Sequence, residues 1–191
     1  MNWETLLCVG DSITIGSRSY LGYPEYCGNK LSIETNKIWN VYNHAVAGYT
    51  TIDLARSIDQ NLSNIKTCKP EIATILIGTN DLKRNTSLDT FKIVYEQVIT
   101  KVRLIVGNNN IVLIEIPKLM EGVMLPYRLE MNLLVDQYNT IINSIAKQRN
   151  LLVCKLETQT EYFYDGVHLN EEGSKIIGYQ IAEYILKLRR S

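Results

Sequence analysis

The chain of 191 residues lacks long apolar runs, an excess of charge and any metal-type spacing of cysteines. No apolar run approaches the roughly 20 residues that a membrane-spanning helix needs. The formal net charge is zero, from 20 basic and 20 acidic residues, so the sequence offers no broad basic surface for DNA or RNA. Its four cysteines show neither CxxC nor CxxH spacing, which argues against a zinc site or a redox pair. We therefore expect no membrane span, no nucleic-acid partner and no metal.

The N-terminus also lacks the features of a secretory leader. Residues 1–5 carry no basic segment, and the apolar run that follows ends at Gly10-Asp11. Cys8 and Cys154 lie inside apolar runs, where free cysteines behave as small core residues. Unpaired cysteines suit a reducing compartment, and the expected location is the cytoplasm.

The sequence does contain a regular alternation of apolar runs and helical periodicity. Continuous apolar runs at 5–9, 72–77, 111–116 and 151–154 are typical of strands buried on both faces, and the mixed run at 38–42 fits an edge strand. Apolar residues at helical spacing predict helices around 55–65, 88–105, 131–145 and 177–188, the last with Asn170 as N-cap. This alternation predicts a single domain over residues 1–191, a three-layer α/β/α sandwich with about five parallel strands.

Four polar motifs follow these strands at the positions where open α/β sheets bind their ligands. Residues 10–12 end the first strand, and residues 43–48 follow the predicted edge strand. Residues 78–81 end the run at 72–77, and residues 165–168 lie between the last strand and the last helix. We expect all four motifs to face one rim of the sheet.

The residue types in these motifs are those that acyl transfer requires. A serine hydroxyl needs a base to take its proton, and histidine suits this near neutral pH because its ordinary pKa is about 6.5. Ser12 lies at a strand-to-helix turn, and His168 follows Asp165 closely enough for one loop to hold both. The backbone N–H of Gly48 and the side-chain amide of Asn80 are candidate donors to an oxyanion.

Together the motifs resemble the GDSL family of lipases and acylhydrolases, also called SGNH hydrolases. The matching pieces are Gly-Asp-Ser-Ile at 10–13, Gly48, Gly-Thr-Asn-Asp at 78–81 and Asp-Gly-Val-His-Leu at 165–169. The order and separation of these pieces match the family over nearly the whole chain. Two positions depart from the pattern, because Ile13 replaces the usual leucine and Ala45 stands where many members have glycine.

The resemblance implies a flavodoxin-like α/β/α fold and a serine esterase that needs no cofactor. It implies that Ser12 is the nucleophile, His168 the base and Asp165 the acid that orients it. The oxyanion hole would consist of the N–H groups of Ser12 and Gly48 and the amide of Asn80. The expected partner is a small soluble ester, as for a short-chain esterase or deacetylase, a lysophospholipase or a thioesterase.

Other interpretations stay open at this point. The chain could be a non-catalytic carbohydrate- or lipid-binding module on the same fold, or an acyltransferase that uses the same residues. Residues 117–127 form an unusually apolar loop, which we expect either to wall the substrate pocket or to form a contact between copies of the chain.

Several polar residues near the motifs have ordinary structural interpretations. Asp11 and Asp81 are expected to support turns and helix caps, and His44 has no acid at a useful spacing. Arg18 is expected to lie on the solvated surface, and Tyr23 is expected to pack in the ordinary way against its neighbours.

Overall fold

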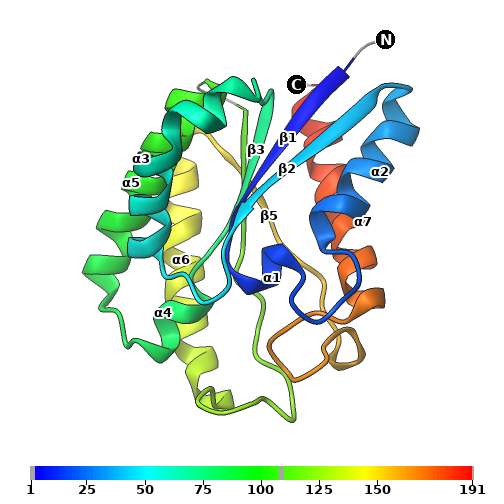
Figure 1. Cartoon of the computed structure of the whole chain (residues 1–191). Coiled ribbons are helices and arrows are strands. Elements are labelled where there is room, and N and C mark those ends of the chain that lie inside the picture. Colours follow the sequence, from blue (N-terminus) through cyan, green and yellow to red (C-terminus); the bar gives the residue numbers. More distant parts are fainter. Residues whose placement is uncertain (1–2, 108–109, 191) are drawn as a thin grey trace.

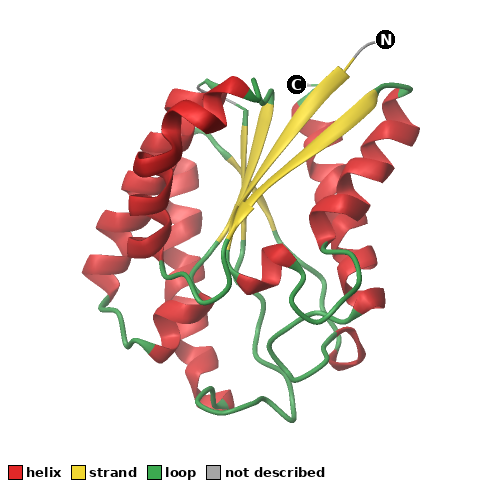
Figure 2. Ribbon diagram, viewed as in Figure 1, coloured by secondary structure: helices red, strands yellow, loops and turns green. Residues whose placement is uncertain are grey.

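The protein is built on an all-parallel sheet. A computed structural model describes residues 3–107 and 110–190, so Met1 and Asn2 of the N-terminal segment lie outside the described residues. The strands in the described part are β1 (Trp3–Gly10), β2 (Ile38–Ala45), β3 (Ile72–Leu76), β4 (Ile111–Ile114) and β5 (Leu152–Cys154). They form one sheet in the order β2-β1-β3-β4-β5, and every neighbouring pair is parallel (Figure 2). This is the flavodoxin-like order, which confirms the predicted fold and the edge position of β2.

Helices cover both faces of the sheet. The α-helices of the described part are α1 (Ser12–Ile15), α2 (Tyr23–Thr35), α3 (Thr51–Thr67), α4 (Thr79–Lys83), α5 (Leu88–Val106), α6 (Asn132–Arg149) and α7 (Glu171–Leu188). Two short 3-10 helices, η1 (Leu129–Met131) and η2 (Thr160–Tyr162), lie in the connections. Helices α3, α5 and α6 cover one face, and α2 and α7 cover the other (Figure 1).

The continuous apolar run of β1 serves two cores. Successive side chains of a strand point to opposite faces of the sheet. Leu7 and Val9 therefore join the cluster formed with α3, α5 and α6, whereas Leu6 and Cys8 join the cluster formed with α2 and α7. All four side chains are fully buried, as expected for a central strand covered on both sides.

Helix α2 is an element that the hydrophobic pattern does not indicate. Its buried stripe is narrow, with Tyr23, Cys27 and Leu31 spaced four residues apart among polar side chains. Pro24 in the first turn suits the start of a helix, because the missing N–H is not needed there. Tyr23 is fully buried, in agreement with the packing role expected for it.

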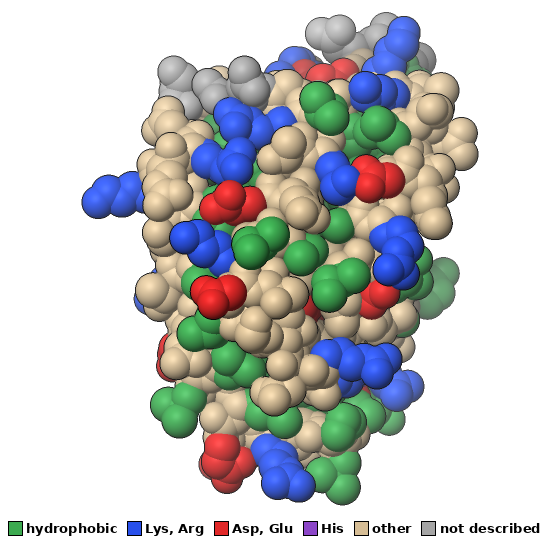
Figure 3. All heavy atoms as spheres, turned by 90° about the vertical axis from the view of Figure 1, so that its left-hand side faces the viewer, with side chains coloured by type: hydrophobic (Ala, Val, Ile, Leu, Met, Phe, Trp, Pro, Cys, Tyr) green, Lys and Arg blue, Asp and Glu red, His purple; other side chains and the backbone are tan. Residues whose placement is uncertain are grey.

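The outer surface of α3 and α5 mixes charges with isolated apolar side chains. Figure 3 shows this face with basic, acidic and apolar side chains interspersed. Lys101 of α5 pairs with Asp59 of α3 at 2.5 Å, and the exposed Ile93 lies nearer the start of α5. Within residues 3–107 and 110–190, no helix is both long enough and apolar enough to cross a membrane.

Candidate active site

The candidate site lies where β1 and β3 end side by side. Because these strands pair directly, the residues that follow them meet at the same edge of the sheet. Ser12 begins α1 directly after β1, and Asn80 lies in α4 directly after β3. This edge is the topological switch point of the sheet, where open α/β folds place their ligands.

The turn after β1 fixes the position of Ser12. Asp11 is the N-cap of α1, and its carboxylate accepts a hydrogen bond from the backbone N–H of Ile13 at 3.0 Å. Asp11 therefore has the structural role in the turn that the sequence predicts. Ser12 is the first residue of α1, and the first N–H groups of a helix have no acceptor within the helix.

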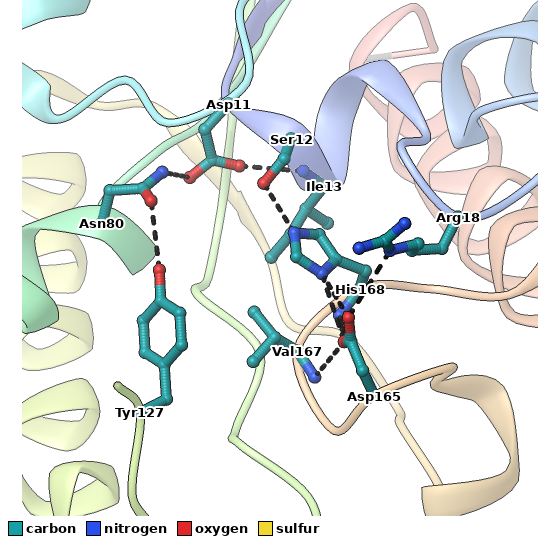
Figure 4. A network of polar contacts seen from close by, with 9 residues as sticks. All are labelled: Asp11, Ser12, Ile13, Arg18, Asn80, Tyr127, Asp165, Val167 and His168. Atoms are coloured by element: carbon teal, nitrogen blue, oxygen red, sulfur yellow. Dashed lines mark hydrogen bonds and ion pairs between the residues drawn. The ribbon is translucent and has the colours of Figure 1, made fainter. Parts of the chain in front are cut away.

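Ser12, His168 and Asp165 form a continuous hydrogen-bonded chain (Figure 4). His168 Nε2 lies 3.0 Å from Ser12 Oγ, although the two residues are 156 positions apart. His168 Nδ1 lies 2.8 Å and 3.1 Å from the two carboxylate oxygens of Asp165. Because an ionised carboxylate can only accept, Nδ1 carries the proton and Nε2 is free to accept from the serine hydroxyl.

The carboxylate of Asp165 is held by several donors. The backbone N–H groups of His168 and Val167 donate to it at 2.8 Å and 3.1 Å, and Arg18 Nε lies 3.7 Å from it. Partial burial would raise its pKa, but the bonds from the His168 backbone and imidazole and from Val167 outweigh burial and lower the pKa below its ordinary value. Asp165 is therefore ionised at neutral pH.

Asn80 connects three parts of the site. Its Nδ2 group donates to the backbone oxygen of Tyr49 at 2.9 Å and to Asp11 Oδ2 at 3.3 Å. Tyr49 directly follows Gly48, an exposed residue in a left-handed conformation with φ 84°. The structure thus places the Asn80 side chain beside Asp11, which precedes Ser12, and bonds this side chain to the loop that contains Gly48.

Two buried carboxylates lie next to these residues. The pKa of Asp11 is raised to about 7, mainly by burial; the bond from the Ile13 N–H opposes this rise and the Asp81 carboxylate adds to it. Asp81 accepts from the backbone N–H and the hydroxyl of Thr51 at 2.9 Å and 2.8 Å, and burial raises its pKa as well. Asp81 therefore joins α4 to the start of α3, the structural role predicted for it.

His44 has a different environment from His168. Its Nε2 lies 3.1 Å from Ser57 Oγ on α3, and burial lowers its pKa. This contact agrees with the structural role expected for His44.

Three sets of contacts in the site were not predicted from the sequence. The Tyr127 hydroxyl lies 3.0 Å from Asn80 Oδ1, and Arg18, expected as solvated surface, reaches Asp165 while remaining half-exposed. In addition, residues 117–127 are bonded directly to the Asp165 loop, because Met120 N donates to Gly166 O and Met124 N donates to Asp165 O, at 2.9 Å and 3.0 Å. The apolar character of this loop was the only signal in the sequence that pointed to it.

The comparisons with known proteins identify the family. The sequence profile of the GDSL-like Lipase/Acylhydrolase family matches residues 8–176. The chain therefore belongs to this hydrolase family, as its motifs predict. No curated protein matches the sequence.

Several solved structures share the fold at low sequence identity. LAE5, an alpha/beta hydrolase enzyme from the metagenome of Lake Arreo in Spain, is 18% identical, with a TM-score of 0.75 over 97% of this chain and 96% of that one. Axe2, an acetylxylan esterase from Geobacillus stearothermophilus, is 22% identical, with a TM-score of 0.71 over 95% of this chain and 94% of that one. At these identities the likeness defines the architecture.

Proposed function

We propose that the protein is a serine esterase that hydrolyses carboxylic esters through an acyl-serine intermediate. The observation that carries the proposal is the contact of 3.0 Å between Ser12 Oγ and His168 Nε2, with Asp165 on the other ring nitrogen. In this proposal Ser12 is the nucleophile, His168 the general base and Asp165 the acid that fixes the tautomer of the imidazole and stabilises the imidazolium. Membership of a lipase and acylhydrolase family supports the same chemistry.

In the acylation step Ser12 Oγ attacks the carbonyl carbon of the ester while His168 Nε2 takes the hydroxyl proton. The bond from carbon to the alkoxy oxygen then breaks, and His168 returns the proton to that oxygen, which leaves as an alcohol. A water molecule attacks the acyl-serine with the same base, so that a carboxylic acid leaves and the Ser12 hydroxyl is restored.

The oxyanion of each tetrahedral intermediate would be bound by the N–H groups of Ser12 and Gly48 and by the amide of Asn80. Each such donor typically contributes about 10²–10³ in rate. Both hydrogens of the Asn80 amide have protein acceptors in the free protein, at 2.9 Å and 3.3 Å. We therefore propose that the oxyanion takes over the longer of these bonds, the one to Asp11.

We propose short-chain esters of small soluble molecules as the substrates and residues 117–127 as a wall of the pocket. The ends of this segment are anchored, with Leu119 and Tyr127 buried, while Met124 and Leu125 are exposed. The backbone bonds from Met120 and Met124 to the Asp165 loop support a position beside the reacting atoms. The acetylxylan esterase activity of Axe2 is compatible with a short acyl group.

The test is hydrolysis of p-nitrophenyl esters of increasing acyl length by the wild type and by Ser12→Ala and His168→Ala. Removing either member of such a pair should lower kcat at least about 10³-fold. Ser17→Ala and His44→Gln are the matched controls, because Ser17 is exposed and His44 contacts Ser57 instead. A folded wild type that is inert on every ester, or a fully active Ser12→Ala variant, would refute the esterase and favour the binding module. Ester products formed with an added alcohol would reveal acyl transfer.

A further inference from the structure

The buried hydroxyl of Tyr127 contacts the side chain of Asn80, a proposed oxyanion donor. Tyr127 ends the 117–127 loop, is 5% exposed and belongs to the buried core on the side of the sheet that α3, α5 and α6 cover. Its hydroxyl reaches Asn80 Oδ1 at 3.0 Å (Figure 4). Burial, followed by the charges of Asp11 and Asp165, raises the pKa of this phenol. The hydroxyl therefore keeps its proton across the working pH range.

The contacts of Asn80 decide which way its amide points. A backbone carbonyl oxygen can only accept, so the atom that faces Tyr49 O at 2.9 Å must be the amide nitrogen. The amide oxygen then faces Tyr127, and the bond of 3.0 Å must run from the Tyr127 hydroxyl to Asn80 Oδ1. Tyr127 is the donor to this oxygen, which lies in a residue that is only 2% exposed.

We infer that Tyr127 is a positioning residue for the oxyanion hole, which it serves by orienting the Asn80 amide and strengthening it as a donor. This inference rests on the proposed esterase function. A bond donated to the amide oxygen withdraws electron density from the nitrogen, so its N–H groups become stronger donors. The same bond keeps the amide from rotating away as the oxyanion forms. The loop that we propose as a pocket wall would then also act on the chemical step.

The experiment compares Tyr127→Phe with wild type on p-nitrophenyl acetate. The substitution keeps the buried ring and removes only the hydroxyl. We expect kcat to fall about tenfold, less than the loss of about 10²–10³ for removing an oxyanion donor outright, with KM changed less than about twofold. Tyr138→Phe is the matched control, because its hydroxyl also donates within the core, to Thr86 O at 2.6 Å, but makes no contact with Asn80.

A double-mutant cycle separates positioning from general stability. In an Asn80→Ala background, Tyr127→Phe should lower kcat less than about twofold, because the amide through which it acts is absent. An equal loss in both backgrounds would overturn the inference, as would an unchanged kcat for Tyr127→Phe in the wild-type background. Thermal unfolding of Tyr127→Phe and Tyr138→Phe identifies any loss that comes from unfolding. If only the inference is wrong, the wild type still hydrolyses esters and still loses activity in Ser12→Ala. If the proposed function is wrong, the wild type is inert on esters, and the inference is wrong as well.

Discussion

Gly166 offers a sharp test of the contact between the 117–127 loop and the Asp165 loop. It lies between Asp165 and Val167 in a left-handed conformation with φ 74°. A Cβ at this position would lie 2.6 Å from Val123 Cα and 2.8 Å from Met120 O, both backbone atoms. Gly122 has nearly the same conformation, with φ 77°, but a Cβ there would meet nothing within 4 Å. The two glycines therefore separate backbone strain from crowding between the loops.

Gly166→Ala should destabilise the protein much more than Gly122→Ala. The left-handed conformation costs a residue with a Cβ about 1–2 kcal/mol, and this cost applies to both variants. Crowding against backbone atoms adds about 1–3 kcal/mol at Gly166 alone. A difference of about 2 kcal/mol corresponds to a Tm difference of about 4–8 °C in a chain of this size.

The assay pairs thermal unfolding with hydrolysis of p-nitrophenyl acetate. Displacing the Asp165 loop by about 1 Å should also lower kcat by up to about 10²-fold in Gly166→Ala, and kcat should fall much less in Gly122→Ala, which leaves that loop in place. Equal Tm values for the two variants would refute the reasoning. They would mean that the loops are not packed together as described.

Three further predictions concern charge, pH and the pocket. Asp165→Asn should lower kcat on the same ester about 10³–10⁴-fold with little change in KM, because an amide cannot hold the imidazole in its tautomer. A variant with the kcat of the wild type would contradict this prediction. Asp11 has a pKa of about 7 when folded, against about 3.9 in an unfolded chain, so the folded state binds the proton more tightly between these values. The contribution of Asp11 to the free energy of unfolding should therefore fall as pH rises from 4 to 7, by up to about 4 kcal/mol. Urea titrations over this range should show a smaller loss of stability for Asp11→Asn than for the wild type. Met124→Gln should shift the acyl-length preference toward shorter chains, and a change in oligomeric state alone would favour a subunit contact instead.

The sequence was sufficient for the parallel sheet because its central strands are buried on both faces, which calls for continuous apolar runs. The runs at 5–9 and 72–77 correspond to β1 and β3, which have helices on both sides and so need continuous apolar residues. The sequence was also sufficient to expect Ser12 and Asn80 at one rim, because parallel strands end at the same edge. The roles of these residues in catalysis stay predictions.

Helix α2 and the contacts of Tyr127 and Arg18 could not be predicted, because they depend on tertiary packing that the hydrophobic pattern of the sequence does not reveal. Helix α2 buries only a narrow stripe, so its periodicity is weak. The contact of Tyr127 with Asn80 depends on the path of an irregular loop, and no spacing rule relates two residues 47 positions apart. Arg18 resembles any surface arginine until the fold brings Asp165 beside it.

The separation of Ser12 and His168 along the chain has a consequence for biosynthesis. A ribosome delivers the proposed nucleophile 156 residues before the proposed base, so a nascent or truncated chain that ends before the Asp165 loop has the serine without a group to accept its proton. Hydrolysis would begin only after the C-terminal segment has emerged, packed against α2 and brought His168 to Ser12. Turnover of a chromogenic ester would then report on the completion of folding, and the appearance of activity during translation would time the docking of this last segment.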